Sequence, residues 1–283
     1  MRRLQYQLST ARELFQCLVM VGVGCSVSAC CQDQLSPSPA DTHDVSSKWQ
    51  TAATVIRVLA PDHIKPGHNY RVLYVLPVES GETTRWGDSM SEVVKHDLHN
   101  KYQLICVFPT FADLPWYADH PTDTHLRQET YLMHDVVPLI EAKYPVQADA
   151  SGRLLVGFSK SGWGAWSLLL RHPDFFGRAA AFDAPMMMDA PGKYGSGPIF
   201  GTAENFVNYQ ISRLLKHRAP ELNRSKPHLA LFGKGNFQKE HVQVTQLLQT
   251  MQIPCHRDDS TVREHSWHSG WLSLAVRWLA APQ

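Results

Sequence analysis

Hydrophobic residues occur along this chain in short runs that alternate with amphipathic segments. Runs rich in apolar and β-branched residues predict strands over residues 54–59, 70–78, 102–108, 154–158, 179–182 and 229–232, and another near Cys255. Apolar residues at helical spacing predict helices over residues 91–99, 128–143, 162–170, 206–217, 238–251 and 271–279. Strands followed by helices in this rhythm predict an α/β fold, with a mostly parallel central sheet covered by helices on both faces.

The first 30 residues follow a different pattern. Three arginines in the first 12 residues precede an apolar run over residues 14–23, which gives way to small residues up to Ala29. This pattern predicts a signal peptide over residues 1–30 and an exported protein that is periplasmic, on the cell surface or secreted. The run is shorter than the roughly 20 residues that span a bilayer.

Two processing routes are open at the end of this segment. The stretch Val27-Ser28-Ala29-Cys30 fits the bacterial lipobox, in which a lipidated Cys30 would tether the protein to a membrane. The alternative is ordinary cleavage after Ala29, because a small residue there suits signal peptidase as well.

Residues 31–48 are polar and contain Ser-Pro repeats, so they predict a flexible linker. The rest of the chain, residues 49–283, is expected to form one catalytic domain that begins near Trp49. A chain of 283 residues with 43% hydrophobic content can bury one sizeable core.

Charge and cysteine content narrow the class of protein further. The net charge of +1 comes from evenly mixed signs, which excludes the broad basic field of a nucleic-acid-binding protein. Of the six cysteines, only Cys106 and Cys255 follow the first 31 residues, and both are expected to be buried thiols. No disulfide framework and no zinc-ligand spacing is visible in the sequence.

The strongest chemical signal lies where the strand at 154–158 meets the following helix. Gly157-Phe158-Ser159-Lys160-Ser161 resembles the G-x-S-x-G nucleophile elbow, which presents a serine at a sharp strand-to-helix turn. Ser159 is the predicted nucleophile. Ser161 is the rival, but it would place Trp163 where the elbow needs a small residue.

The elbow also predicts where an oxyanion would be stabilised. The backbone N–H of Lys160, at the start of the helix, is expected to be one donor. The second donor is expected from the loop after the strand at 70–78, at Val78 or Glu79.

A histidine between the last strand and the last helix would act as the general base in such a fold. His265 lies there, and His268 is the alternative. The two histidines could instead suggest a metal site, but no carboxylate or cysteine cluster completes one, so we expect no metal.

A third residue, an acid that orients the histidine, completes a catalytic triad in such a fold. An amide, Asn236, stands where an acid is expected after the strand at 229–232. Asp183, at the end of the preceding strand, is the leading candidate, and Glu240 is the third.

With these residues in view, the chain resembles the esterase family of the α/β-hydrolases that includes esterase D, feruloyl esterases and the antigen 85 mycolyltransferases. The resemblance rests on Gly157-Phe158-Ser159, on His265-Ser266-Trp267 and on the segments 107–119 and 129–141. It implies ester hydrolysis or acyl transfer through an acyl-enzyme, without a cofactor. It further implies a small-molecule or polysaccharide-linked ester as substrate, Ser159 as nucleophile and His265 as base.

Several aromatic residues lie in loops expected at the carboxyl edge of the sheet. Trp116, Tyr117 and Trp267 are candidates for a substrate-binding wall, whereas Trp163 and Trp271 are expected to pack the loops.

The sequence thus predicts a serine esterase. Two alternatives stay open: a catalytically weak hydrolase-like domain that binds glycans or another surface partner, suggested by the amide at the acid position, and an acyltransferase on the same fold.

Overall fold

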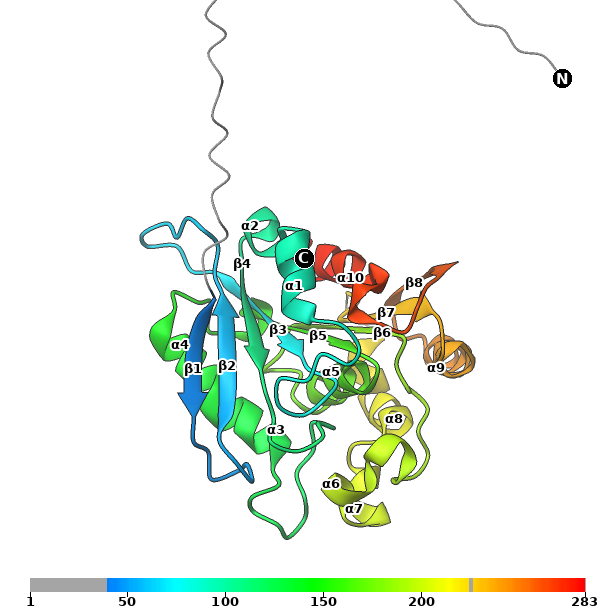
Figure 1. The fold of residues 1–283 in the computed structure, drawn as a ribbon. Helices are drawn as coiled ribbons and strands as arrows, with labels where there is room; N and C mark the ends of the chain where they lie inside the picture. The colour runs from blue at the N-terminus through cyan, green and yellow to red at the C-terminus, as the bar shows by residue number, and fades with distance from the viewer. Residues whose placement is uncertain (1–39, 224–225, 283) are drawn as a thin grey trace, which may run out of the picture. The chain divides into compact units, whose positions relative to one another are not determined.

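The computed structural model describes residues 40–223 and 226–282, which lie in one compact unit. Their strands form one sheet in the order β1-β2-β4-β3-β5-β6-β7-β8 (Figure 1). The strands are β1 (Asp41–Val45), β2 (Thr54–Leu59), β3 (Arg71–Leu76), β4 (Leu104–Pro109), β5 (Arg153–Phe158), β6 (Arg178–Phe182), β7 (Leu229–Lys234) and β8 (Cys255–Val262).

The sheet is parallel from β4 through β3, β5, β6 and β7 to β8, whereas β1, β2 and β4 pair in antiparallel fashion. Every residue of the central strands β4, β5 and β6 is buried. A parallel sheet with both faces covered requires such continuous apolar runs. The predicted α/β-hydrolase architecture is confirmed.

The helices are α1 (Ser89–Lys95), α2 (Leu98–Tyr102), α3 (Gln128–Tyr131), α4 (Val137–Lys143), α5 (Lys160–Arg171), α6 (Gly197–Phe200), α7 (Ala203–Val207), α8 (Ile211–Leu222), α9 (Gln238–Thr250) and α10 (Trp271–Ala280). A π-helical turn, η1 (Leu132–Val136), joins α3 to α4, and short 3₁₀ turns occur at η2 (Ala150–Gly152), η3 (Lys193–Gly195) and η4 (Trp267–Ser269).

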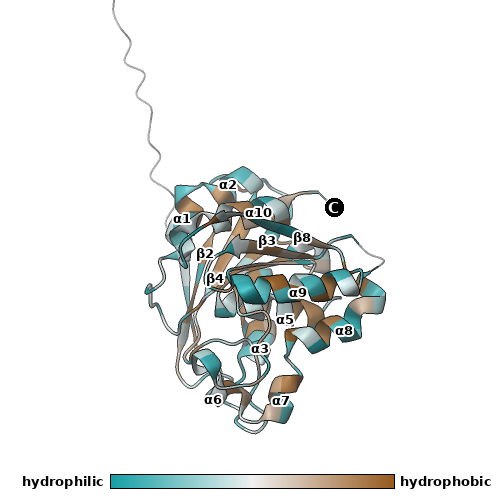
Figure 2. Cartoon of the chain, turned by 90° about the vertical axis from the view of Figure 1, so that its right-hand side faces the viewer, coloured by the Kyte–Doolittle hydropathy of each residue, from teal (hydrophilic) through white to brown (hydrophobic). Residues whose placement is uncertain are grey.

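Two hydrophobic cores lie on opposite faces of the sheet. Val156 and Phe158 of β5 pack with α1, α2 and α10, whereas Leu155 packs on the other face with α5, α8 and α9. Side chains alternate between faces along a strand, so one strand supplies both cores. Figure 2 shows the helices that cover the sheet with both hydrophobic and hydrophilic segments, as expected for helices with one face in the core.

The predicted linker over residues 31–48 is corrected at its carboxyl end. Asp41–Val45 form β1, which pairs with Thr54–Val58 of β2. The fold therefore begins before Trp49. The pattern was missed because β1 is an edge strand whose side chains are exposed or half-buried, so it lacks the apolar residues that mark an interior strand.

Two predicted helices are each divided in the structure. The helix expected over residues 206–217 is α7 and α8, separated by a break at Asn208–Gln210, and the helix expected over 91–99 is α1 and α2. The helix expected over residues 128–143 is α3, η1 and α4, and Pro138 lies in the first turn of α4, directly after the π-helical turn.

Within residues 40–223 and 226–282, no helix is both long and apolar enough to cross a membrane. The predicted signal peptide and Cys30 lie outside the described residues. Cys106 and Cys255 are both free thiols; Cys106 is buried as expected, whereas Cys255 is half-buried.

Candidate active site

Ser159 occupies a strained turn between β5 and α5. Its backbone has φ 54° and ψ −126°, a region that non-glycine residues rarely adopt, and it is the N-cap of α5. The strain is supported by hydrogen bonds on both sides: the Ser159 N–H donates to Phe182 O at 3.1 Å, and Gly162 N–H donates to Ser159 O at 3.0 Å. Strain at one residue held by its surroundings is typical of a functional turn.

The close packing around Ser159 explains why the positions two residues before and after it, Gly157 and Ser161, are small. A Cβ on Gly157 would lie 2.1 Å from the backbone oxygen of Ser161, so no larger residue fits there. Ser161 is fully buried, and its hydroxyl bonds to Phe158 O and accepts from Phe158 N–H, each at 2.9 Å. Ser161 therefore braces the turn, and its hydroxyl does not contact His265.

His265 bridges the serine and an acid. Its Nε2 lies 3.2 Å from Ser159 Oγ, and its Nδ1 lies 2.6 Å from Asp183 Oδ2. The ring packs on Phe158, with centroids 4.4 Å apart, and edge-on against Trp86 at 5.2 Å. Nδ1–H donation to the carboxylate leaves Nε2 free to accept the serine proton.

Asp183 is fully buried, and the loop after β7 holds its carboxylate in place. Phe237 N–H donates to Oδ1 at 2.9 Å and Asn236 N–H donates to Oδ2 at 3.1 Å. Burial alone would raise the pKa of Asp183, but these N–H groups and His265 outweigh it and lower the pKa below its usual value. The group therefore stays ionised, as an orienting acid requires.

The other two acid candidates do different work. Asn236 offers its backbone N–H to Asp183, and Glu240 Oε2 accepts from Met187 N–H at 2.8 Å. The carboxylate that contacts His265 therefore comes from the end of β6, and the loop after β7 supplies N–H donors to it. The alternative base His268 lies elsewhere: its Nε2 accepts from Asp88 N–H at 3.1 Å, and it does not line the cavity at Ser159.

His241 is a supporting residue that the sequence pattern did not reveal. It is buried on α9, its Nε2 accepts from Ala184 N–H at 3.0 Å and its Nδ1 lies 3.3 Å from Gly233 O. Burial lowers its pKa, which favours the neutral ring that these two contacts require. His241 thus joins the ends of β6 and β7 beside Asp183. Nothing in the sequence distinguishes it from the other histidines.

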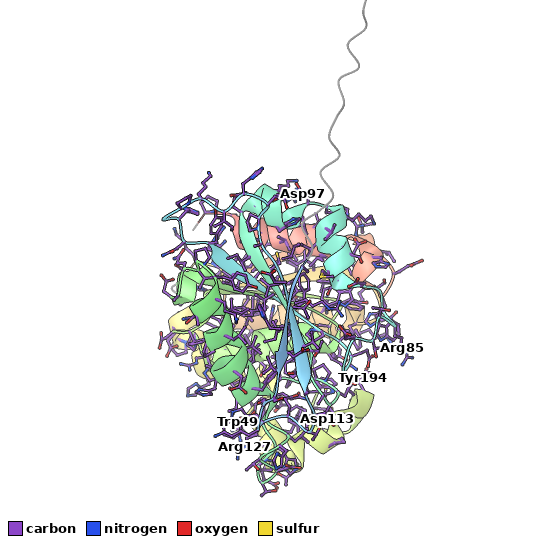
Figure 3. All side chains as sticks on the ribbon, turned by 60° about the vertical axis from the view of Figure 1, so that its left-hand side comes forward. Trp49, Arg85, Asp97, Asp113, Arg127 and Tyr194 are labelled. Atoms are coloured by element: carbon purple, nitrogen blue, oxygen red, sulfur yellow. The ribbon has the colours of Figure 1, made fainter. Side chains whose placement is uncertain are left out.

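A cavity of about 430 Å³ opens above Ser159 and His265. Its walls include Trp86, Tyr194 and Phe237 as aromatic rings. Arg85 also lines the cavity, and Figure 3 shows Arg85 and Tyr194 on the same side of the molecule.

The predicted aromatic wall of Trp116, Tyr117 and Trp267 is wrong. Trp116 and Tyr117 are fully buried, Trp267 is 3% exposed, and none of the three lines the cavity at Ser159. Trp267 instead packs edge-on against Phe158 and Phe182. The prediction relied on the position of these rings in loops at the carboxyl edge of the sheet. In the structure the three rings pack inside the protein instead, because burial of aromatic surface stabilises the fold.

An ion pair lies at the edge of the cavity. Lys160 Nζ is 3.5 Å from Glu79 Oε1, which also accepts from Trp86 Nε1 at 3.0 Å. Burial lowers the pKa of Lys160, the Glu79 carboxylate opposes this, and the nearby Arg85 adds to the lowering. Glu79 therefore holds one aromatic wall of the cavity as well as the lysine.

The predicted oxyanion donors lie around the same cavity, which Val78, Glu79 and Lys160 all line. Lys160 is the first residue of α5, so its N–H has no partner within the helix. Val78 and Glu79 lie after β3, separated from it by Pro77, and within the described residues neither backbone N–H donates to a protein acceptor. Their role as donors stays a prediction.

Among residues 40–223 and 226–282, no group of three or more His, Cys, Asp or Glu side chains is arranged to hold a metal ion. The site consists of the serine, the histidine, the aspartate and the cavity above them.

Solved structures with this fold include serine hydrolases. A ferulic acid esterase matches with a TM-score of 0.66 and 21% identity over 85% of this chain and 95% of its own. A fluorophosphonate-binding serine hydrolase from Staphylococcus aureus matches with a TM-score of 0.69 and 15% identity over 86% of this chain and 100% of its own. At these identities the similarity establishes the fold.

Sequence relatives narrow the class. The esterase Rv1288 of Mycobacterium tuberculosis is 28% identical over 134 residues, which are 46% of this chain and 29% of the relative. This chain therefore spans less than a third of that protein. The family model described as Putative esterase matches residues 46–274, which contain Ser159, Asp183 and His265. The chain belongs to the putative esterase family.

Proposed function

We propose that this protein is a serine esterase that hydrolyses carboxylic esters through an acyl-enzyme at Ser159. The observation that carries the proposal is the continuous chain of contacts from Ser159 Oγ through His265 to the buried Asp183 carboxylate. Membership in the esterase family supports the same reaction.

Acylation begins when Ser159 Oγ attacks the ester carbonyl and its proton passes to His265 Nε2. Asp183 stabilises the imidazolium that forms, since its carboxylate stays ionised inside the protein. The oxyanion receives hydrogen bonds from the N–H of Lys160 and from the Val78–Glu79 segment. The carbon–oxygen bond to the alcohol then breaks, and His265 returns the proton to the leaving alcohol.

Deacylation repeats the steps with water. His265 Nε2 takes a proton from water as the water oxygen attacks the acyl carbon, and then returns it to Ser159 Oγ when the carboxylic acid leaves. Neither acylation nor deacylation, as proposed, requires a cofactor. An acyltransferase would differ only in using another alcohol in place of water, and no feature of the site favours that alternative.

The cavity suggests the type of substrate. Trp86, Tyr194 and Phe237 offer flat apolar surface beside Ser159, which suits an ester with an aryl acyl group. The similarity to a ferulic acid esterase supports this choice. Tyr194 is 50% exposed, so the cavity opens outward and can admit an ester attached to a polysaccharide.

Export is a separate part of the proposal. The arginines and the apolar run in residues 1–30 support a signal peptide, and Cys30 is the residue that a lipid anchor would use. The mass of the mature N-terminus from the native host distinguishes lipidation at Cys30 from cleavage after Ala29.

The test is covalent labelling with a fluorophosphonate, with the adduct mapped by mass spectrometry. We expect a single adduct on Ser159, fast in the wild-type protein and almost absent in Ser159→Ala and His265→Ala. Ser161→Ala, if it folds, should still be labelled at Ser159. Ester hydrolysis is then compared between aryl and alkyl acyl groups of similar size. A folded wild-type protein that neither reacts with the probe nor hydrolyses any ester would rule the function out.

A further inference from the structure

We propose that Tyr117 is a positioning residue of the oxyanion hole, whose hydroxyl orients the Val78 N–H through the carbonyl of Pro77. The proposal rests on the proposed esterase function. It assigns a role to a residue that lies outside the cavity and outside the triad.

The contact that carries the proposal is a hydrogen bond between two chain segments. Tyr117 Oη donates to Pro77 O at 2.5 Å. The Pro77 carbonyl and the Val78 N–H belong to one peptide unit, which is planar and trans, so the two groups point in opposite directions. A donor fixed on the carbonyl therefore fixes the direction of the N–H. It also polarises the peptide unit and makes that N–H a stronger donor.

The ring of Tyr117 fits its place closely. A Cβ on Gly164 of α5 would lie 2.0 Å from the ring, and Phe111 packs edge-on with centroids 5.3 Å apart. The ring therefore lies directly against α5, the helix that Ser159 caps. Burial raises the pKa of Tyr117, so the hydroxyl keeps the proton that it donates.

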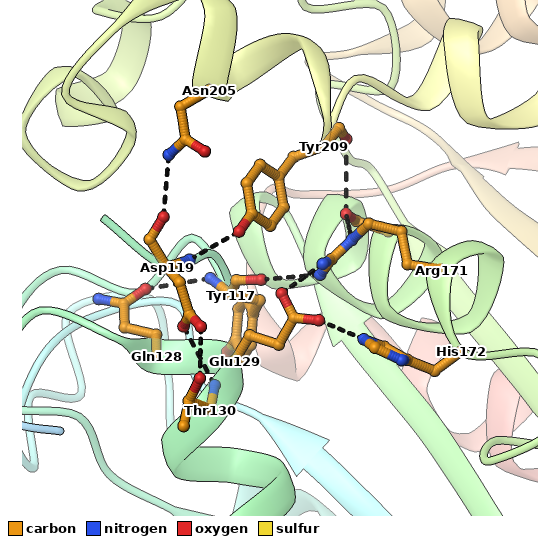
Figure 4. Close-up of polar contacts among 10 residues, drawn as sticks. Tyr117, Asp119, Gln128, Glu129, Thr130, Arg171, His172, Asn205 and Tyr209 are labelled. Carbon is orange, nitrogen blue, oxygen red and sulfur yellow. Dashed lines mark hydrogen bonds and ion pairs between the residues drawn. The ribbon is translucent and has the colours of Figure 1, made fainter. Parts of the chain in front are cut away.

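The backbone of Tyr117 is held in an uncommon conformation, with φ 56°. Its N–H donates to Oε1 of the fully buried Gln128 at 3.0 Å, and its carbonyl accepts from Arg171 Nη2 at 3.4 Å. Figure 4 shows these contacts, together with the Glu129 carboxylate between Arg171 and His172. A strained residue whose backbone N–H and carbonyl are both held by side chains points to a functional constraint on its position.

The experiment compares two buried tyrosines that pack on the same phenylalanine. Tyr117→Phe removes the hydroxyl on Pro77, whereas the control Tyr131→Phe removes a hydroxyl that bonds to Thr54 Oγ1. Turnover of 4-nitrophenyl acetate and inhibition by a phenylboronic acid, which mimics the tetrahedral intermediate, are measured together with the unfolding temperature. We expect kcat to fall at least tenfold in Tyr117→Phe with KM within twofold. Boronate affinity should fall with kcat, and Tyr131→Phe should keep the wild-type kcat.

A second variant guards against a folding defect. Arg171→Lys keeps a charge beside Glu129 but removes the planar fork that reaches the Tyr117 carbonyl. We expect kcat to fall less in Arg171→Lys than in Tyr117→Phe, with KM again unchanged. Unchanged kcat in both variants, or equal losses in Tyr117→Phe and Tyr131→Phe, overturns the role of Tyr117. A wild-type protein without esterase activity overturns the proposed function as well, so the two failures are distinct.

Discussion

At the residue scale, the triad depends on where the acid comes from. Asp183 adopts φ 41° at the end of β6, and its carboxylate faces the loop after β7. A Cβ on Gly235 would lie 2.5 Å from Asp183 Oδ2, so glycine at this position lets the loop close over the acid. The loop that contains Asn236 therefore holds the Asp183 carboxylate in place through its backbone N–H groups.

Replacement of Asp183 by Asn tests this assignment. An amide cannot stabilise the imidazolium and favours the wrong tautomer of His265, so kcat is expected to fall by a factor on the order of 10³–10⁴. Steady-state ester hydrolysis measures the loss. Glu240→Gln, which still accepts from Met187 N–H, is the control and should retain the wild-type kcat. The reverse ranking of the two variants would show that the acid is misassigned.

Some residues of the site can be predicted from the local sequence, and others cannot. Ser159 and His265 follow from a short motif and from their order in the chain. The acid does not, because Asp183, Asn236 and Glu240 all lie near strand ends and only their contacts separate them. The lining by Trp86, Tyr194 and Phe237 was not predicted, since these rings come from three loops far apart in sequence.

At the element scale, one buried carboxylate joins α3 to α5. Glu129 of α3 pairs with Arg171 at the end of α5 and with the adjacent His172. Burial alone would raise the pKa of Glu129, but the hydrogen bond from His172 and the charge of Arg171 outweigh it, so the pKa is lowered from about 4.5. The stabilisation from the ionised Glu129 carboxylate is therefore fully present above pH 4.5 or so, the usual pKa of this group. It is lost as the pH falls through the lower pKa of the folded state.

Glu129→Gln is expected to lower the free energy of unfolding at pH 7 by about 3 kcal/mol, because it leaves a largely buried Arg171 without its partner. It should also flatten the dependence of stability on pH below about 4.5, where the wild-type carboxylate takes up its proton. Urea unfolding between pH 3 and pH 7 measures both effects. Glu221→Gln, in an exposed ion pair with Arg218, should behave like the wild type. If the free energy of unfolding depends on pH in the same way in Glu129→Gln and in the wild type, the Glu129 carboxylate does not stabilise the fold as proposed.

At the scale of the whole molecule, β1 closes one edge of the sheet. It pairs with β2, and two of its own side chains contact the residue that caps α4: His43 Nε2 lies 2.7 Å from Tyr144 Oη, which donates to Asp41 Oδ2 at 2.9 Å. An uncovered β2 would present unpaired backbone groups to other chains.

A chain that begins at Trp49 is therefore expected to be less stable than one that begins at Pro37, and to self-associate through β2. Its unfolding temperature should fall by several degrees, on the order of the 2–4 °C that each 1 kcal/mol causes at this size. Scanning calorimetry and light scattering on both chains measure the two effects, and kcat per folded molecule should be equal. Equal stability and solubility would mean that β1 contributes little.

The sequence by itself determined the α/β architecture and predicted Ser159 as the nucleophile and His265 as the base. The strands are continuous apolar runs because both faces of a parallel sheet are buried, and the elbow needs small residues at fixed spacing around Ser159. The tertiary structure decided which carboxylate contacts His265, the lining of the cavity, the contacts of His241 and the edge strand β1. These features depend on contacts between segments far apart in the chain, and such contacts leave no periodic pattern in the sequence.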